Sequence, residues 1–256
     1  MPQWDAEQYL KFHLERTQPV IDLIHRIDLH DPRRIVDLGC GPGNSTEALR
    51  TRWPTAEIVG LDNSAAMIER ARQGFPEGNW TVGDAATWEP AEPFDLVFSN
   101  AMLQWVPDRE RLVSHLFDQV AEGGALAVQG PAHSDSVLHR EIIEVSRDPR
   151  WTDRMEGERR AMTNHPPEFY YDLLGRRASL LHIWETTYYH VLAGPEKVLE
   201  WFRGSGLRPF LEALTADEER RSLEKALLAR YERSYPRRAD GCILFPFRRL
   251  FLVAYG

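Results

Sequence analysis

The strongest constraint on the fold is a regular alternation of short β-branched runs with helical patterns between Arg33 and Gly130. Strands that alternate with helices in this way indicate βαβ units, and therefore a doubly wound, mostly parallel α/β sheet. The predicted strands are 35–38, 57–61, 80–82, 94–98 and 125–128. The predicted helices between them are 45–53, 64–72 and 108–120, the last of which is expected to stop at Gly123-Gly124.

The flanking segments are less regular. Asp5 with Gln8 is typical of a capping box that opens an N-terminal helix, and Pro19 is expected to start a second helix. The stretch 131–167 has no clear period and is predicted to be an insertion over the edge of the sheet. Beyond it we expect helices at 168–174 and 195–202, a strand at 180–189, a helix from a capping box of Thr215 and Glu218 to about 232, and a strand at 249–254.

Composition narrows the class of partner. The chain has 256 residues and a net charge of −8, and its basic residues are interleaved with acids, which disfavours nucleic acid and favours a small molecule. An acidic protein can still bind an anion where Arg and His gather in one cleft. Cys40 and Cys242 lie far apart without close ligand neighbours, so we expect free thiols and no metal. No apolar run is long enough to span a membrane, and no signal peptide is evident, so a cytoplasmic protein is expected.

The turn Gly39-Cys40-Gly41-Pro42-Gly43 follows the first predicted strand and precedes a helix. Glycine is needed where a Cβ would block a ligand from the main chain or where a turn requires positive φ. The helix that follows directs its free N–H groups at the same place. The spacing lacks the last glycine of the dinucleotide fingerprint and the Gly-Lys-Ser/Thr of a P-loop, so pyrophosphate is not the favoured ligand.

Two acids follow the next strands. Asp62 ends the second strand about twenty residues after the turn, where a carboxylate can accept both hydroxyls of a ribose. Asp84 follows the third strand and can accept the amine of an adenine. Either acid alone fits a cap or a turn equally well. Together with the glycine turn they lie at the carboxyl ends of consecutive strands, which indicates a nucleoside site.

These motifs resemble those of the class I S-adenosylmethionine-dependent methyltransferases, over residues 33–130. The resemblance implies a Rossmann-like domain, with S-adenosylmethionine as the cofactor. The turn would hold the methionine part, Asp62 the ribose and Asp84-Ala85 the adenine. The implied cofactor residues are Gly39, Cys40, Gly41, Gly43, Asp62, Asn63, Asp84, Ala85, Asn100 and Ala101.

A likeness over nearly the whole chain is to the methyltransferases of this class that esterify small organic acids such as trans-aconitate. It rests on Trp4-Asp5, Tyr9-Leu10, Glu15-Arg16 and the segments 37–46, 103–108, 186–190 and 206–209. It implies a methyl ester on a carboxylate of trans-aconitate or a related di- or tricarboxylic acid. The implied organisation is one domain over 1–256, in which helices in 1–30 contribute to the cleft, 33–130 binds the cofactor, 131–175 is a lid insertion and 176–256 completes the sheet. A monomer is expected.

A carboxylate is already ionised at neutral pH, so its methylation needs no general base and no catalytic acid–base residue is predicted. The protein must position the acid and neutralise its other carboxylates. Gln104 and Trp105 are expected nearest the methyl group, although Trp105 also fits a core role. The predicted acid-binding residues are Tyr9, His13, Arg16, Gln104, Trp105, Tyr171 and Arg208, with Arg248, His165, Tyr170 and His190 as further candidates.

Other functions stay open at this point. A carboxyl methyltransferase for another small acid or for an acid bound to an acyl carrier would share the glycine turn. A non-catalytic S-adenosylmethionine sensor on the same fold would bind cofactor without turnover, because a fold does not fix a function. An NAD-dependent enzyme is disfavoured by the glycine spacing.

Overall fold

The structure is a computed structural model that describes residues 13–132, 134–162 and 164–256, with side chains from Thr17 onward. Contacts within the chain divide it into two compact units. The sheet unit contains residues 13–131, 165–186 and 249–256, and the described part of the helical unit contains residues 132, 134–162, 164 and 187–248. Strands β6 (Leu180–Leu192) and β7 (Ile243–Tyr255) contribute residues to both units. The single domain expected over 1–256, with its lid, stays a prediction.

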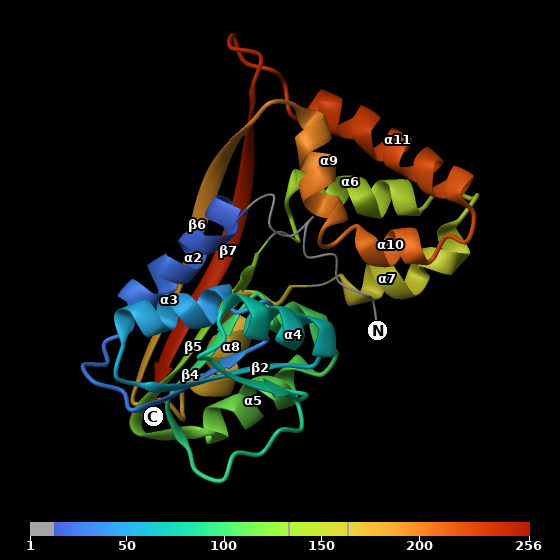
Figure 1. The fold of residues 1–256 in the computed structure, drawn as a ribbon. Helices are drawn as coiled ribbons and strands as arrows, with labels where there is room; N and C mark the ends of the chain where they lie inside the picture. The colour runs from blue at the N-terminus through green and yellow to red at the C-terminus, as the bar shows by residue number, and fades with distance from the viewer. Residues whose placement is uncertain (1–12, 133, 163) are drawn as a thin grey trace. The chain divides into compact units, whose positions relative to one another are not determined.

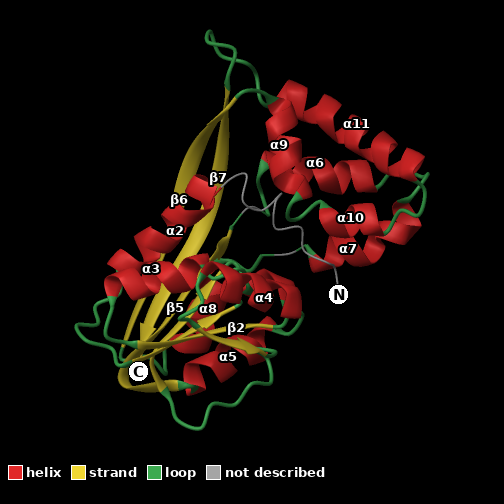
Figure 2. Ribbon diagram, viewed as in Figure 1, coloured by secondary structure: helices red, strands yellow, loops and turns green. Residues whose placement is uncertain are grey.

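The predicted doubly wound sheet is confirmed (Figures 1 and 2). It has seven strands in the order β3-β2-β1-β4-β5-β7-β6. The pairs among β1 to β5 are parallel, and β7 runs antiparallel to β5. The first strands are β1 (Arg34–Leu38), β2 (Glu57–Asp62), β3 (Asn79–Val82), β4 (Phe94–Asn100) and β5 (Val120–Pro131).

Strand β1 lies at the point where the strand order reverses. Its Val36 pairs with Val59 of β2 on one side and with Val97 of β4 on the other, and its side chain is fully buried. A central parallel strand is apolar because helices cover both faces of the sheet. Open α/β sheets bind ligands outside the carboxyl ends of their strands at this switch point. The end of β1 is therefore where a site is expected.

Helices cover the two faces of the sheet in separate groups. Helix α2 (His13–His25) packs on α3 (Asn44–Arg52) and β5, and α4 (Ala65–Gly74) packs on β2 and β3. Helices α5 (Arg109–Asp118) and α8 (Pro167–Leu174) pack on each other, and α5 also packs on β5. In Figure 1, α3 and α4 lie on one side of the sheet and α5 on the other. Right-handed crossovers that lead away from β1 in opposite directions produce this arrangement.

Two helix starts that the sequence predicted are confirmed by their caps. The Ser64 hydroxyl accepts a hydrogen bond from the N–H of Met67 at the start of α4, and the Asp108 carboxylate accepts one from the N–H of Arg111 at the start of α5. Each cap satisfies a main-chain donor that has no partner inside the helix.

The end predicted for the third helix is wrong. Helix α5 ends at Asp118, and Val120, which was assigned to the helix, opens β5 opposite Phe94. Gly123, expected to stop the helix, lies inside β5 with φ +75° where the pairing register shifts. A glycine with positive φ produces such a bulge, and β-branched Val120 suits a strand as well as it extends the apolar stripe of the helix.

Two further expected helix starts are wrong. Pro19 lies inside α2, because a proline removes a single N–H and the helix continues through it. Helix α11 (Asp217–Ser234) begins after Ala216 without a side-chain cap, so Thr215 and Glu218 do not form the expected box. Acids in its first turn, Asp217 among them, stabilise that end through the helix dipole instead. The capping box of Asp5 and Gln8 lies outside the described residues.

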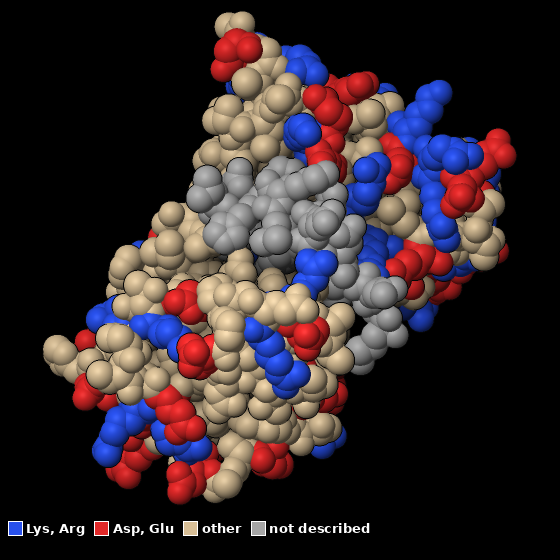
Figure 3. Space-filling model, in the orientation of Figure 1, with Lys and Arg blue, Asp and Glu red and all other residues tan. Residues whose placement is uncertain are grey.

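The helical unit contains most of the stretch in which no pattern was found. Within 131–167 lie α6 (Val137–Ser146), a short 3-10 helix (Thr152–Met155) and α7 (Glu156–Ala161). Helix α11 packs on both α6 and α9 (Pro195–Arg203), and the short α10 (Arg208–Glu212) precedes it. The surface in view in Figure 3 carries acidic and basic side chains interspersed over this unit. Such a surface fits exposed ion pairs rather than a basic binding stripe.

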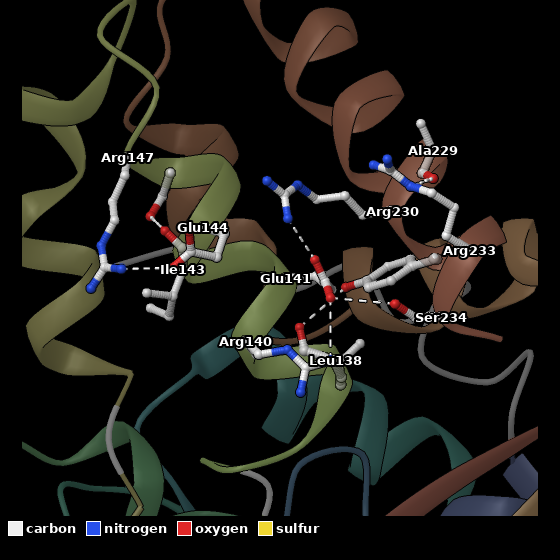
Figure 4. A network of polar contacts seen from close by, with 12 residues as sticks. Leu138, Arg140, Glu141, Ile143, Glu144, Arg147, Ala229, Arg230, Arg233 and Ser234 are labelled. Atoms are coloured by element: carbon white, nitrogen blue, oxygen red, sulfur yellow. Dashed lines mark hydrogen bonds and ion pairs between the residues drawn. The ribbon is translucent and has the colours of Figure 1, made fainter.

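A buried acid explains why α6 escaped detection (Figure 4). Glu141 is 7% exposed on the same face as Leu138, Ile142 and Val145, so it interrupts the apolar pattern. Its carboxylate accepts hydrogen bonds from Arg230 at 2.8 Å, from Arg140 at 3.3 Å and from the Ser234 hydroxyl at 3.3 Å. Burial opposes the charge most strongly, but the hydrogen bonds and charges of Arg230 and Arg140 bring the pKa of Glu141 below its ordinary value. A buried carboxylate is tolerated when it is paired in this way.

Candidate cofactor and acceptor site

The glycine turn leaves β1 and enters α3 with a left-handed backbone. Gly39, Gly41 and Gly43 have φ values of +72°, +55° and +95°. The N–H groups of Gly39 and Cys40 donate to the carbonyl of Leu61 at 2.8 and 3.1 Å, which ties the turn to β2. L-amino acids with a side chain rarely adopt such φ values, so the backbone requires glycine at these positions.

The three glycines meet different surroundings. A Cβ at Gly39 would lie 2.4 Å from Cγ of Met102, and one at Gly43 would lie 2.7 Å from the Trp80 ring. A Cβ at Gly41 would meet nothing within 4 Å. Gly39 and Gly43 thus allow close packing, whereas Gly41 leaves open space beside bare main chain. Such space fits a ligand that approaches the backbone.

Asp62 connects the turn to the end of β2. Its Oδ2 accepts a hydrogen bond from the Gly41 N–H at 3.0 Å, and its Oδ1 accepts one from the Ser64 N–H at 2.8 Å. Burial raises the pKa of this carboxyl above its ordinary value, although both hydrogen bonds act against the rise. An ionised carboxylate has about four acceptor positions, so two ribose hydroxyls can still bind.

Asp37 lies beneath the turn and is completely buried. Its Oδ2 accepts hydrogen bonds from the hydroxyls of Ser45 at 2.6 Å and Thr46 at 2.7 Å. Among the described residues its Oδ1 has no hydrogen-bond partner, although it is buried. Burial is the largest influence and raises the pKa of Asp37 from 3.8 to about 6. A buried acceptor without a donor is costly, so this atom fits a cationic group placed at the turn.

The predicted adenine acid lies in a turn after β3. Asp84 is exposed, and its Oδ1 accepts a hydrogen bond from the Ala86 N–H at 3.0 Å. Ala85 beside it is buried, and Val82, which ends β3, is 50% exposed. Asn63, after Asp62, is exposed. This end of the sheet therefore presents an acid beside an exposed apolar side chain, which suits a base with a polar edge and an apolar face.

The carboxyl end of β4 is held by a chain of polar side chains. Gln129 of β5 donates from its Nε2 to the Asn100 side-chain oxygen and accepts from Arg249 at 3.1 Å. Ala101 follows with φ +56°, the only described residue other than glycine with a positive φ. Its N–H donates to the Gln129 carbonyl at 2.8 Å. A backbone held out of its ordinary conformation in this way marks a candidate site.

The short 3-10 helix Leu103–Trp105 follows, and both predicted acceptor-side residues lie on it. The Gln104 Nε2 donates to the Ala101 carbonyl at 2.6 Å. Its Oε1 is buried, with no hydrogen-bond partner in the described part of the chain. Trp105 is 43% exposed, which overturns the alternative that it is a core residue. A large exposed aromatic side chain suits the wall of a binding site.

Sequence analysis missed Arg109, the first residue of α5. It is 8% exposed and donates from Nε to the Leu103 carbonyl at 3.2 Å and from Nη2 to the Gln104 carbonyl at 2.9 Å. The available signal was its position, because Arg109 lies three, four and seven residues before Leu112, Val113 and Leu116, on the buried face of the helix.

His165 and Tyr170, two further residues expected to bind the acid, lie near Arg109 in the sheet unit. Burial and the Arg109 charge lower the pKa of His165. Burial raises the pKa of the Tyr170 hydroxyl, and the Arg109 charge acts against that rise. The His165 ring stacks on Phe169 with centroids 3.8 Å apart. Tyr171 is 64% exposed and therefore lies on the surface of α8.

The remaining candidates belong to the helical unit or lie outside the described side chains. Arg208 donates to Glu212 at 2.7 Å, and Arg248 donates to the Ala132 carbonyl at 2.8 Å and to the Asp135 carboxylate. His190 is buried and packs on Trp201 with ring centroids 4.8 Å apart. Tyr9 lies outside the described residues, as do the side chains of His13 and Arg16, whose backbone belongs to α2.

Cys40 is buried behind the turn. Burial raises the pKa of its thiol far above the usual range, and the carboxylates of Asp37 and Asp62 add to the rise. A thiol of this kind is an inert packing group. No group of three or more metal-ligating side chains occurs within the described ranges. Of the helices that the structure describes, none has the length and apolar character needed to cross a membrane.

Comparisons with known proteins agree with this geometry. Residues 35–124 match a family model described as a methyltransferase domain. Solved structures of the YcgJ protein from Bacillus subtilis and of a putative methyltransferase from Bacillus halodurans each share the fold, with a TM-score of 0.60. They cover 93% of this chain and 97% and 98% of their own, at 14% and 15% identity. Fold, glycine turn and strand-end acids together define a class I S-adenosylmethionine-dependent methyltransferase.

Relatives of higher identity narrow the class. The trans-aconitate 2-methyltransferase of Azoarcus sp. (strain BH72) is 46% identical, and the alignment covers 99% of each chain. The enzyme of the same name from Rhodopseudomonas palustris (strain BisB18) is 44% identical with the same coverage. The chain belongs to the trans-aconitate 2-methyltransferase family.

Proposed function

We propose that this protein transfers the methyl group of S-adenosylmethionine to a carboxylate of trans-aconitate, or of a closely related small di- or tricarboxylic acid, and forms a methyl ester. The observation that carries the proposal is the 46% identity over 99% of both chains. The alignment therefore extends over the residues outside 35–124 as well as over the part that matches the methyltransferase-domain model.

The residues at the switch point fit the cofactor. The open space beside Gly41 and the buried Oδ1 of Asp37 suit its amino-acid end, Asp62 suits the ribose hydroxyls, and Asp84 with Ala85 suits the adenine. Asn63, Asn100 and Ala101 complete the proposed set, with Gly39, Cys40 and Gly43 in the turn. When bound, the cofactor supplies an electrophilic methyl group on a sulfonium.

The protein's part in the reaction is positioning. An acid with ordinary carboxyl pKa values is ionised at neutral pH, so no side chain has to remove a proton. We propose that Gln104 and Trp105, which follow β4, orient the acid and exclude water from the reacting carboxylate. Anion and sulfonium lose their charges as they combine, so a dry site favours the reaction.

A polycarboxylate also needs cationic or hydrogen-bonding partners for the carboxylates that do not react. We propose that Tyr9, His13, Arg16, Tyr171 and Arg208 supply them. Arg208 already donates to Glu212 in the described structure, so it would have to exchange this partner for the acid. Of the two variants Arg16→Ala and Arg208→Ala, we therefore expect Arg16→Ala to show the larger rise in the KM for trans-aconitate.

The test is direct. Purified protein is incubated with methyl-labelled S-adenosylmethionine and, in separate reactions, with trans-aconitate, cis-aconitate, citrate and succinate. The proposal expects a base-labile methyl ester with the highest kcat/KM on trans-aconitate. If only another acid is methylated, that acid and not trans-aconitate is the substrate. Cofactor binding without ester on any acid would favour a sensor.

On the face in view in Figure 3, acidic and basic side chains are interspersed, which supports a protein without a nucleic-acid partner. We also propose a cytoplasmic monomer that acts as one catalytic domain with residues 131–175 as a lid. Light scattering of the cofactor-bound protein and fractionation of cells that produce it test the oligomeric state and the location.

A further inference from the structure

We infer that Arg109 is a positioning residue for the acceptor side: its buried guanidinium fixes the turn Leu103–Trp105 and so sets where Gln104 and Trp105 meet the acid. The inference rests on the proposed function. It starts from the two hydrogen bonds that Arg109 donates to the carbonyls of Leu103 and Gln104, at 3.2 and 2.9 Å.

The placement of Arg109 is costly without such a role. A guanidinium that is 8% exposed has lost most of its hydration, and burial lowers its pKa. It also lies at the first position of α5, where the helix dipole disfavours a cation. Its hydrogen bonds to main-chain carbonyls offset part of this cost, and the planar fork of Arg can reach two carbonyls at once.

The turn is held from both ends. Arg109 binds the Gln104 main chain, while the Gln104 side chain donates to the Ala101 carbonyl at 2.6 Å. Ala101 itself is fixed at φ +56° by its hydrogen bond to Gln129. A loop fastened at its carbonyls and at a side chain has few alternative conformations, which is what the support of a binding residue requires.

The orientation of the Gln104 amide follows from these contacts. Its nitrogen faces the Ala101 carbonyl, so its oxygen points into buried space where no described group donates to it. An amide nitrogen carries two N–H donors, of which the Ala101 bond uses one. If the turn loosens, this amide loses its fixed direction, and the donor it offers to a carboxylate moves with it.

The charge of Arg109 reaches two more side chains of the sheet unit. Helix α8, which contains Tyr170, packs on α5, which begins with Arg109, and the Arg109 charge influences the pKa values of both Tyr170 and His165. His165 and Tyr170 can donate hydrogen bonds to an anion, and a buried cation behind them raises the local positive potential. Removal of Arg109 should therefore weaken acid binding more than cofactor binding.

Arg109→Ala tests the inference, with Arg111→Ala as the matched control because Arg111 is an exposed residue of the same helix. For Arg109→Ala we expect kcat/KM for trans-aconitate to fall about 10- to 100-fold, mainly through KM, because a small misplacement of a positioning group has effects of this size. The dissociation constant for S-adenosylhomocysteine, measured by calorimetry, should change less than about twofold. Arg111→Ala should match the wild type in both.

Three readouts separate positioning from general damage. Added guanidinium ion should restore part of the activity of Arg109→Ala and none in Arg111→Ala. Hydrogen exchange of the peptide over residues 101–107 should speed up in Arg109→Ala in the ligand-free protein. The effects of Arg109→Ala and Gln104→Ala on KM should be less than additive, because both act on one turn. If Arg109→Ala does not fold, Arg109→Gln takes its place.

The outcomes decide the inference separately from the proposed function. Unchanged KM and unchanged exchange at 101–107 in the folded variant would overturn the positioning role, as would an equal loss of cofactor affinity. A wild type that esterifies no acid contradicts the proposed function, while exchange at 101–107 still tests whether Arg109 holds the turn.

Discussion

The Oδ2 atom of Asp62 accepts a hydrogen bond from the main-chain N–H of Gly41, with 3.0 Å between the two atoms. One carboxylate therefore shapes the glycine turn and at the same time faces the position proposed for the ribose. Its Oδ1 accepts from the Ser64 N–H, so the side chain cannot rotate freely. The hydrogen bond between Asp62 and Gly41 thus connects the end of β2 to the turn after β1. Among the described contacts, no other pair of predicted site residues makes this connection.

Replacement of Asp62 should lower cofactor affinity. Asp62→Ala removes the acceptor proposed for the ribose hydroxyls and frees the Gly41 N–H. Because hydrogen bonds to a charged group are strong, we expect the dissociation constant to rise by about 10- to 100-fold. Calorimetric titration with S-adenosylhomocysteine measures the change. Glu57→Ala, at the exposed start of the same strand, is the control and should bind like the wild type. Equal affinities for Asp62→Ala and wild type would remove Asp62 from the ribose site.

Gly41 offers a test of the open space at the turn. Gly41→Ala adds a Cβ where no protein atom lies within 4 Å. The free energy of unfolding should therefore fall by about 1 to 2 kcal/mol, mainly because a side chain disfavours the left-handed backbone. Gly123→Ala is a matched control, since Gly123 has φ +75° and equally open surroundings, in the bulge of β5. Both variants should lose similar stability in urea.

Only Gly41→Ala should also lose affinity for S-adenosylhomocysteine, because the added methyl group occupies space proposed for the ligand. Calorimetry on the two folded variants makes the comparison. A similar affinity in both would show that the space beside Gly41 is not used by the cofactor.

Part of the site was predictable because its signals are local. The glycine turn, Asp62 after its strand and the helix start near Ser64 each depend on a few neighbouring residues, and the structure places them as expected. Arg109 was missed because its burial depends on the packing of α5 against the sheet. Helix α6 was missed for a related reason, since Glu141 occupies its inward face.

Other errors arose where two local signals compete. Val120 fits a helical stripe and a strand equally well, and the pairing with Phe94 decides in favour of the strand. Pro19 is an ordinary helix start, but it is tolerated within α2. Such choices depend on tertiary contacts and cannot be made from the neighbouring sequence alone.

Asp37 predicts a specific dependence of stability on pH. Burial raises the pKa of Asp37 from 3.8 to about 6, so between these values the native state holds a proton that the unfolded state has released. The contribution of Asp37 to stability therefore falls as pH rises through this window and stays low above it. A rise of this size corresponds to about 3 kcal/mol.

Asp37→Asn removes the charge and keeps an acceptor for Ser45 and Thr46. In the ligand-free protein it should match the wild type near pH 4 and exceed it by up to about 3 kcal/mol at pH 7, as measured by urea unfolding. The variant should nonetheless bind S-adenosylhomocysteine more weakly, because the cationic group proposed at the turn would lose its carboxylate partner. A difference in stability that stays constant from pH 4 to pH 7 would contradict the raised pKa.

Glu141 predicts the opposite dependence in the helical unit. Although burial is the largest influence and opposes ionisation, the hydrogen bonds and charges of Arg230 and Arg140 bring the pKa of Glu141 below its ordinary value. The unfolded state then binds the proton at higher pH than the native state does. The stabilisation is complete at neutral pH and disappears as pH falls through the lowered native pKa.

Glu141→Gln should lower the free energy of unfolding by about 1 to 3 kcal/mol at pH 7, because a charged acceptor of hydrogen bonds between α6 and α11 is replaced by a neutral amide. The difference from the wild type should shrink as pH falls below the ordinary glutamate range. Glu144→Gln is the control, because Glu144 lies on the same helix and is more exposed. It should lower the free energy of unfolding less, since its ion pair with Arg147 lies at the surface. Urea unfolding at several pH values makes the measurement, and a loss that grows toward low pH would show that Glu141 is not held in its ionised form by Arg230.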